Sequence, residues 1–176
     1  MEVRPVCQED LNWLADQRNR PELRRWFRQP SLLSEQDQGT WYQSIRAFGP
    51  TFILHEGLKR LGYISLNHIQ WTHRTAEFSI FVIPEVQGKG YGGTGLAWLL
   101  DHAFNDLNLH LVYGEVFSGN PGMTLYKKLG FVQEGTLRDR YFKDGAYQPC
   151  DMISITEKEW RARKPSMILK ESEIPA

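Results

Sequence analysis

A glycine-rich turn between an apolar strand and a helix constrains the fold of this chain more than any other feature. It follows the apolar run Thr75–Ile83 and precedes a run of leucines at helical spacing. Glycines let the backbone turn tightly and expose successive N–H groups, and the start of a helix adds the positive end of its dipole. Lys89 adds a cation. The sequence therefore predicts an anion cradle, suited to a pyrophosphate, at Gln87, Gly88, Lys89, Gly90, Tyr91, Gly92 and Gly93.

The segments around this turn predict one α+β domain with a mixed sheet. Strands are predicted at Met1–Val6, Thr51–His55, Leu61–Ile69, Thr75–Ile83, Leu111–Phe117, Phe131–Arg138 and Cys150–Thr156. Helices are predicted at Glu9–Arg18, from Pro21, from Ser34 to Phe48, and at Gly92–Leu107 and Pro121–Leu129. Short links among the second to fourth strands indicate an antiparallel meander. We expect a single domain over residues 1–160 and a tail over residues 161–176, with Glu157–Ala176 fraying.

Composition excludes several classes of protein. The 21 basic and 21 acidic residues cancel, which argues against a nucleic-acid partner held by bulk charge. The two cysteines are too far apart in the sequence to indicate a disulfide framework or a Cys-x-x-Cys metal site. The histidines do not have the spacing of metal ligands, so no metal is expected. The chain begins without a secretory h-region and contains no apolar run long enough to span a bilayer. We predict a cytoplasmic protein with no membrane partner.

Other nucleotide-binding motifs fit the glycine-rich turn less well. A Walker A loop requires Ser or Thr after its lysine, but Gly90 follows Lys89. Gly90–Gly95 does match the G-x-G-x-x-G fingerprint, with Glu115 further on as its acidic residue. However, Pro84–Lys89 separates the strand from the first glycine, and the preceding strands form a meander. An NAD-binding oxidoreductase remains the alternative from another class.

Three segments together resemble the GNAT superfamily of N-acetyltransferases. Gln87-Gly88-Lys89-Gly90-Tyr91-Gly92 is similar to its coenzyme A loop, within a longer match over Ala76–Gly93. Leu125–Gly135 resembles its later helix-to-strand motif, and Arg138–Ile155 resembles the branch of ribosomal-protein N-terminal and spermidine acetyltransferases. The resemblance implies the GNAT acyl-CoA N-acyltransferase fold, a mostly antiparallel central sheet splayed at the coenzyme site and flanked by helices. It also implies acetyl-CoA as cosubstrate, and it allows a homodimer.

The resemblance implies roles for particular residues. Main-chain groups of Phe81 and Val82 would contact the pantetheine arm, and Tyr126 would protonate the departing thiolate, although it also suits the apolar face of a helix. Relatives carry a coenzyme-contacting asparagine seven positions before the tyrosine. Gly119 occupies that position here, so Asn120, one place later, is the candidate coenzyme contact.

Glu77 is the candidate general base. An acidic residue within an apolar strand is costly unless it is exposed or paired. A carboxylate there could take the proton that an ammonium must lose before its nitrogen attacks a thioester, directly or through water. A surface position or a structural ion pair would explain Glu77 equally well.

The acceptor is predicted from a basic, aromatic segment. Residues 18–28 contain five arginines but only one acidic residue, Glu22. The arginines are Arg18, Arg20, Arg24, Arg25 and Arg28. Arginines beside aromatic rings suit an anionic, stackable ligand. We expect Arg25, Trp26, Phe27 and Trp41 to bind the acceptor, and an amino-sugar nucleotide is the first candidate. A protein N-terminal amine and a polyamine are alternatives, as is a non-catalytic module that binds coenzyme.

Overall fold

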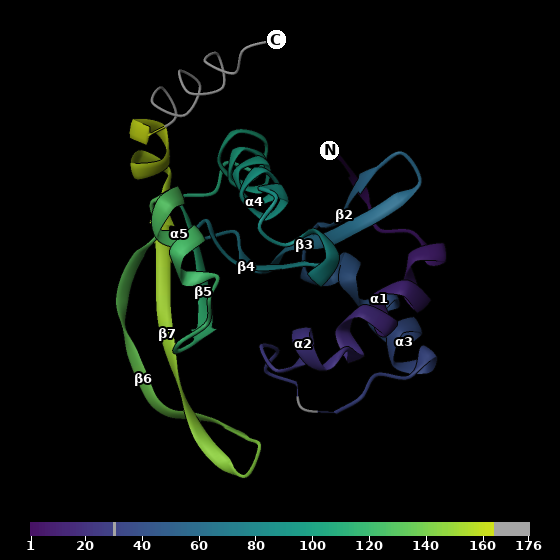
Figure 1. Ribbon diagram of the computed structural model, residues 1–176. Coiled ribbons are helices and arrows are strands. Elements are labelled where there is room, and N and C mark those ends of the chain that lie inside the picture. Colours follow the sequence, from purple (N-terminus) through teal and green to yellow (C-terminus); the bar gives the residue numbers. More distant parts are fainter. Residues whose placement is uncertain (30, 164–176) are drawn as a thin grey trace.

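The structure is a computed structural model that describes residues 1–29 and 31–163 (Figure 1). Its single sheet has seven strands in the order β1-β2-β3-β4-β5-β7-β6. The strands are β1 (Glu2–Pro5), β2 (Thr51–Glu56), β3 (Lys59–Gln70), β4 (Thr75–Val82), β5 (Leu111–Phe117), β6 (Val132–Lys143) and β7 (Ala146–Thr156). The helices are α1 (Leu11–Asn19), α2 (Pro21–Arg24), α3 (Glu35–Phe48), α4 (Tyr91–Asp101) and α5 (Met123–Leu129). The predicted fold class and element order are confirmed.

One parallel strand pair interrupts an otherwise antiparallel sheet. β4 pairs with β5 only at Thr75–Leu111, Ala76–Val112 and Glu77–Tyr113, after which the strands part. Beyond this point β4 runs on to Val82 while still paired with β3, and β5 runs on to Phe117 while paired with β7. The parting opens a gap in the middle of the sheet, as the sequence comparison with GNAT proteins led us to expect.

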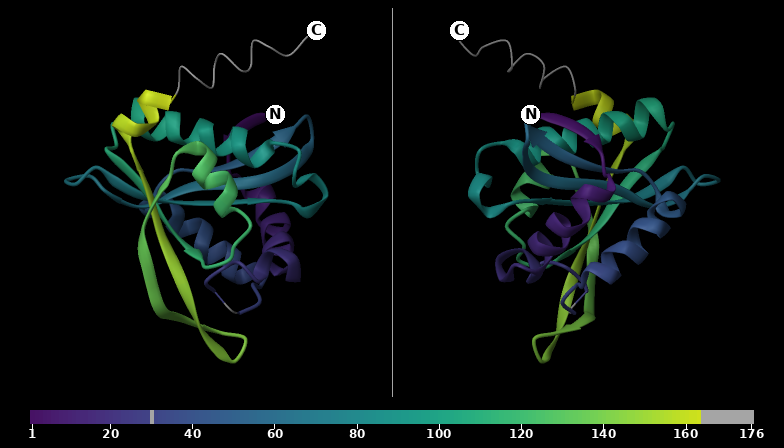
Figure 2. Two further views of the ribbon diagram at one scale, coloured as in Figure 1. Left: turned by 60° about the vertical axis from the view of Figure 1, so that its left-hand side comes forward. Right: turned by 90° about the vertical axis from the view of Figure 1, so that its right-hand side faces the viewer.

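The helices lie on both faces of the sheet. Figure 2 shows α4 and α5 over one face and α1 and α3 over the other. The side of α4 that carries Leu96, Leu99 and Leu100 is fully buried against the strands. That burial follows from apolar residues recurring at helical spacing. The predicted helix continues past α4 as a π-helical turn, His102–Asp106, before β5 begins.

Local sequence signals explain where two of the helices begin and end. At the start of α3, the Asp37 N–H donates to Ser34 Oγ (3.1 Å) and the Ser34 N–H donates to Asp37 Oδ2 (2.8 Å). This reciprocal pair satisfies two N–H groups that the helix leaves free. At the end of α5, Gly130 adopts a left-handed conformation with φ of +103°, which a glycine reaches without steric cost.

The C-terminal strands are longer than predicted. The segment between Arg138 and Cys150 is not a polar excursion, because β6 and β7 form one continuous hairpin that projects from the body (Figure 1). Asp144 and Gly145 close it with φ of +51° and +81°. These angles belong to the tight turn that an Asp-Gly pair favours between twisted strands, so the dipeptide was a usable signal.

The expectation that the chain frays from Glu157 is wrong for its described part. Residues 157–163 are helical, and Trp160 is buried. The Trp160 indole N–H donates to Asp101 Oδ1 over 2.9 Å and so ties this turn to α4. Burial of a large ring with its polar group satisfied outweighs the entropy that a terminal helix gains by fraying. The rest of the predicted tail, residues 164–176, lies outside the described residues.

Candidate active site

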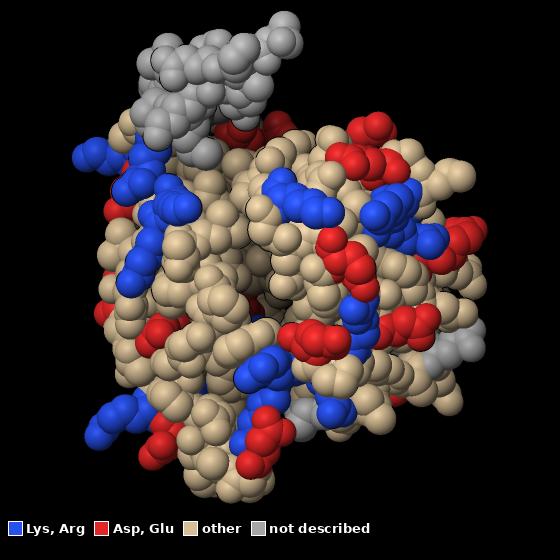
Figure 3. All heavy atoms as spheres, in the orientation of Figure 1, with Lys and Arg blue, Asp and Glu red and all other residues tan. Residues whose placement is uncertain are grey.

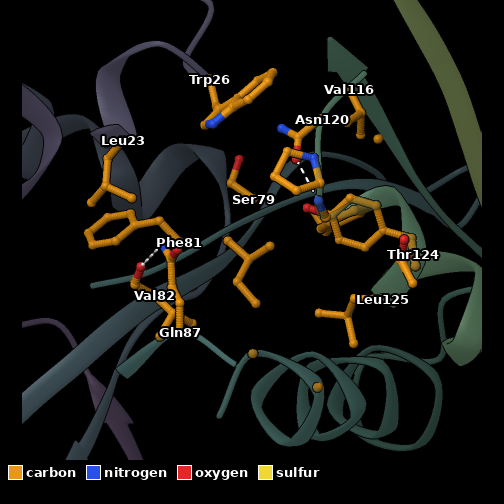
Figure 4. A pocket seen from close by; sticks show the side chains of 18 of the residues that line it. Leu23, Trp26, Ser79, Phe81, Val82, Gln87, Val116, Asn120, Thr124 and Leu125 are labelled. Atoms are coloured by element: carbon orange, nitrogen blue, oxygen red, sulfur yellow. Dashed lines mark hydrogen bonds between the residues drawn. The ribbon is translucent and has the colours of Figure 1, made fainter. Parts of the chain in front are cut away.

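The gap between β4 and β5 contains a cavity of about 610 Å³. Figure 4 shows its walls, with Leu23 and Trp26 on one side, Asn120, Thr124 and Leu125 on the other, and the start of α4 beneath. In the space-filling view the face around it is hollowed, with acidic and basic side chains interspersed (Figure 3). A concave site with apolar walls and a few polar groups is the usual setting for a small-molecule ligand.

The glycine-rich turn forms one wall of this cavity. Gly88 and Gly90 have φ of +78° and +88°, and a Cβ at either position would meet no atom within 4 Å. Gly90 is the N-cap of α4 and no side chain caps the helix, so its first N–H groups are left for a ligand. The lining also includes Gln87, Gly92 and Gly93. This arrangement suits a pyrophosphate.

The side chains of Gln87, Lys89 and Tyr91 differ in what they contact. The Gln87 amide donates to the Val82 carbonyl over 2.9 Å and thereby fastens the turn to the end of β4. Lys89 and Tyr91 are not among the cavity-lining residues, and the Tyr91 hydroxyl donates to Glu56 Oε2 over 3.0 Å. Lys89 is exposed, so of these residues it is the one free to approach a phosphate from solvent.

Phe81 and Val82 lie on the part of β4 that has left β5. Both line the cavity, and the Phe81 ring is stacked on Tyr63 with a centroid distance of 5.7 Å. Glycine at position 62 allows β3 to approach β4 closely here, because a Cβ would lie 2.4 Å from the Phe81 carbonyl oxygen. β4 therefore stays firmly paired on one side while its other edge faces the cavity.

Tyr126 and Asn120 line the opposite wall. Tyr126 is 8 % exposed, its ring packs edge-on against Phe78 (5.3 Å), and burial raises the pKa of its hydroxyl to about 12. It therefore holds its proton at neutral pH and can donate it. Asn120 Oδ1 accepts from the Gly122 N–H over 2.8 Å, which shapes the turn into α5. Its side-chain NH₂ makes no hydrogen bond within residues 1–29 and 31–163 and remains available to a ligand.

Glu77 lies at the point where β4 and β5 part and is almost fully buried. Arg28 Nη2 lies 2.6 Å from Glu77 Oε1, and His68 Nε2 lies 3.9 Å from Glu77 Oε2. His68 sits at an irregularity in β3 with φ of +51°, a feature that re-aims strand side chains. The suggested surface position of Glu77 is wrong, because the residue is buried. Its geometry fits both a structural ion pair and a general base, because the ion-paired carboxylate also lines the cavity.

Sequence reasoning missed a second carboxylate in the site. Glu115 in β5 also lines the cavity and lies 3.9 Å from Arg28 Nη1. Burial opposes its ionisation, but hydrogen bonds from Tyr141 (2.5 Å) and Arg140 (3.3 Å) hold the pKa of Glu115 below its usual value. Glu115 interrupts an apolar strand just as Glu77 does, so the same signal could have found it. It was instead considered only as the acidic residue of a dinucleotide fingerprint.

A smaller cavity of about 330 Å³ adjoins the first. The two share the lining residues Phe27, Arg28, Glu77, Ser79, Ile80 and Phe81. Arg18, Trp41, Tyr63 and Asn67 complete its walls together with neighbouring residues. Glu77 therefore stands at the junction, where a molecule held in one cavity could meet a molecule held in the other.

The predicted acceptor residues divide between these cavities. Trp26 lines the larger one, Trp41 the smaller one, and Phe27 lines both. Arg25 lines neither, because its exposed guanidinium lies over the Trp26 ring at 5.1 Å. Three of the four predicted residues therefore line a cavity, but the sequence pattern singled out Arg25, whereas Arg28 makes the contact with Glu77.

Lys143, at the end of β6, is a further residue that sequence reasoning missed. Its buried ammonium donates to the carbonyls of Arg24 (2.9 Å), Arg25 (2.9 Å) and Phe27 (2.6 Å). These three bonds use every proton of the ammonium and fasten the segment that carries Phe27 and Arg28 to the hairpin. No local sequence pattern predicts such a contact, because its partners lie more than 100 residues apart.

Within residues 1–29 and 31–163, no helix is both long and apolar enough to cross a bilayer. In the same part of the chain, no three His, Cys, Asp or Glu side chains are grouped so that they could hold a metal ion.

Comparison with known proteins gives consistent matches along the chain. Residues 1–132 match the family model of the acetyltransferase (GNAT) domain. Spermidine N(1)-acetyltransferase of Vibrio cholerae is 32% identical over 165 residues, covering 92% of this chain and 95% of the relative. The Escherichia coli K12 protein of that name is 31% identical, covering 92% and 89%. Ribosomal-protein-serine acetyltransferase of Escherichia coli is 24% identical over 86% of each chain.

A solved structure also matches the whole fold. The crystal structure of Vibrio cholerae spermidine N-acetyltransferase in complex with CoA and spermine superposes with a TM-score of 0.86 at 29% identity. The match covers 91% of this chain and 97% of that one.

Proposed function

This chain belongs to the GNAT acetyltransferase family, and we propose that the amine it acetylates from acetyl-CoA is a primary amine of a polyamine. The relatives named for spermidine match nearly the full length of the chain, at about a third identity. This preference replaces the amino-sugar nucleotide that the arginine-rich segment suggested. In the structure most of those arginines contact neither cavity.

One structural observation carries the proposal. Glu77 and Glu115 together face the guanidinium of Arg28, at 2.6 Å and 3.9 Å. Two carboxylates that already pair with an organic cation form a site that suits a protonated amine. Trp26 and Phe27 also line this cavity and add aromatic surface that the methylene groups of such a substrate could contact.

The proposed reaction assigns a proton acceptor and a proton donor. The acceptor arrives as an ammonium and loses a proton to Glu77, directly or through water, so that its nitrogen becomes nucleophilic. The nitrogen attacks the thioester carbonyl carbon, the C–N bond forms, and the C–S bond breaks. Tyr126, protonated at neutral pH, donates its proton to the leaving thiolate, and the nitrogen passes its second proton through water to the resulting phenolate as the amide forms. Both substrates are held together, Glu77 being at the junction of the two cavities.

The coenzyme contacts are part of the same proposal. The N–H groups of the Gln87–Gly93 turn would bind the pyrophosphate, the open edge of β4 at Phe81 and Val82 would bind the pantetheine arm, and Asn120 would contact it from the other wall. The support is their position on the lining of one continuous cavity.

A second candidate acceptor, an amine that also carries a carboxylate or phosphate, is favoured by Arg18. This half-buried guanidinium lines the smaller cavity and makes no ion pair within residues 1–29 and 31–163. Burial removes part of the water around this charge and so lowers the pKa of Arg18. Its ring contact with Phe27 (5.3 Å) does not neutralise that charge, so an anionic group of a ligand would be stabilised there.

A panel of acceptors tests the assignment. Thiol release from acetyl-CoA would be followed with spermidine, spermine, a diamine, an amino-sugar nucleotide and a peptide with a free N-terminus, an amidated C-terminus and no acidic side chain. The proposal expects the highest kcat/KM for a polyamine. A higher value for the amino-sugar nucleotide would favour the second candidate, and a higher value for the peptide would overturn both.

A further inference from the structure

Arg28 takes up the position in which an incoming amine would have to meet the candidate base. Its Nη2 lies 2.6 Å from Glu77 Oε1, within hydrogen-bonding distance. The other carboxylate oxygen, Oε2, faces His68 at 3.9 Å. Glu77 therefore has its closest contact with a cation of the protein itself.

The two partners differ in how tightly the structure holds them. The Glu77 side chain is 6 % exposed, whereas the Arg28 side chain is 37 % exposed and belongs to the turn after α2. A buried carboxylate needs a cation, because leaving it unpaired is much costlier than exchanging one partner for another. An exposed arginine has no such need, since water can solvate it.

A second carboxylate gives Arg28 a place to move to. Glu115 Oε2 lies 3.9 Å from Arg28 Nη1, and the Tyr141 hydroxyl lies 3.4 Å from the same nitrogen. The Arg28 side chain can therefore leave Glu77 without losing its charged and hydrogen-bonded surroundings. Lys143 holds the backbone of the preceding residues, so the movement is confined to the Arg28 side chain.

We propose that the Arg28 guanidinium occupies the binding position of the acceptor's ammonium group and is exchanged for it when the acceptor binds. Arg28 is then a specificity-determining residue. It keeps the Glu77 carboxylate paired with a cation while the site is empty, and it competes with every cationic acceptor. The inference rests on the proposed function in one respect, namely that the acceptor arrives as a cation.

The substitution Arg28→Gln tests the exchange. It removes the competing cation, so a larger fraction of the protein is ready to bind an ammonium. The KM for spermidine should fall by at least about threefold, and the KM for acetyl-CoA should stay within about twofold. Arg138→Gln is the matched control, because Arg138 is exposed on β6 and makes no ion pair within the described part of the chain. It should leave both constants unchanged.

A second variant guards against misfolding. Arg28→Lys keeps the charge but has fewer hydrogen-bond donors, so the KM for spermidine should lie between those of the wild type and Arg28→Gln. Isothermal titration of spermidine into the wild type and each variant, without acetyl-CoA, measures the dissociation constant of spermidine. These constants should change in the same order as the KM values. An unchanged or higher spermidine constant in both Arg28 variants overturns the proposal.

Failure of the exchange is distinguishable from failure of the proposed function. If the wild type acetylates no polyamine, the proposed function fails, and the comparison is repeated with whichever amine of the panel is acetylated. A lower KM in Arg28→Gln still supports the exchange. A higher KM means that Arg28 binds an anionic group of that acceptor, and the exchange is then wrong.

Discussion

The ammonium of Lys143 donates to the carbonyl of Phe27 over 2.6 Å, although 116 residues separate them in the chain. The contact joins the C-terminal hairpin to the N-terminal turn that carries Phe27 and Arg28. Residues of the same hairpin, Arg140 and Tyr141, hold Glu115. The proposed acceptor side of the cavity is thus assembled from segments near the two ends of the chain. Changes in the hairpin should therefore weaken binding of the acceptor more than binding of the coenzyme.

Replacing Lys143 by Met tests this coupling. The change leaves three carbonyls without their buried donor, and we expect the free energy of unfolding to fall by about 2 kcal/mol. We also expect a severalfold higher acceptor KM with an unchanged acetyl-CoA KM. Urea denaturation and steady-state kinetics measure the two effects. Lys158→Met, at an exposed position, is the control. Equal rises of both KM values would mean that Lys143 supports the fold only.

Tyr126→Phe should lower kcat by about 10- to 100-fold while the acetyl-CoA KM stays within about twofold. The variant keeps the ring that packs on Phe78 and removes only the proton donor. Since the pKa of Tyr126 is raised to about 12, wild-type turnover should not decline through its ionisation below about pH 11. Single-turnover measurement isolates the chemical step. An unaltered rate there would remove Tyr126 from the acid role.

Glu77→Gln should lower kcat by about 10²- to 10³-fold, because an amide cannot accept the proton of the ammonium. Glu115→Gln is the matched comparison, since it also removes one carboxylate facing Arg28 but lines only the larger cavity. We expect Glu115→Gln to raise the acceptor KM and to leave kcat within a few-fold. Rates of the two variants over a range of pH provide the measurement. Similar kcat losses in both would assign the base to water or to another group.

Gly90→Ala should weaken the binding of acetyl-CoA. Its φ of +88° is strained for alanine, and we expect about 1 kcal/mol of lost stability together with a displaced start of α4. Gly57→Ala carries a comparable backbone cost, at φ of +54° in the turn between β2 and β3. Neither Cβ would meet an atom within 4 Å. Titration with acetyl-CoA should show weaker binding in Gly90→Ala alone. Equal affinity in both variants would contradict an anion cradle at this turn.

The Asp10 carboxyl should make the stability of the fold depend on pH. It is fully buried; burial opposes its ionisation, but hydrogen bonds from Arg4 (2.7 Å), the Cys7 N–H and Arg60 hold the pKa of Asp10 well below its usual range. A carboxyl whose pKa is lower in the folded state stabilises the fold above its unfolded pKa, and this contribution is lost as pH falls.

Asp10→Asn should therefore cost about 3 kcal/mol at pH 7, because it leaves two arginines without their partner. The difference from the wild type should shrink as the pH is lowered below about 4, where the unfolded carboxyl binds its proton. Urea denaturation at several pH values measures it. A difference that stays constant down to pH 2 would contradict this assignment.

Local patterns in the sequence predicted most of the helices and strands and part of the candidate site. Ser34 with Asp37, the leucines of α4 and the glycines from Gly88 to Gly93 act through neighbours in the sequence, so their structural consequences can be read without the fold. Glu77 was detectable because a charge in an apolar strand needs an explanation. Glu115 offered that same signal, and the Asp144-Gly145 turn offered another that would have extended the hairpin.

The order of residues alone determined the strand, turn and helix that form the proposed anion cradle, because φ angles, helix ends and apolar periodicity are properties of short segments. Tertiary structure alone decided that Arg28 rather than Arg25 meets Glu77, that Glu115 joins them, and that Lys143 holds their turn in place. These are contacts of charged side chains with groups far apart in the chain. Their strength depends on distance and burial, and neither is defined until the sheet has brought its strands together.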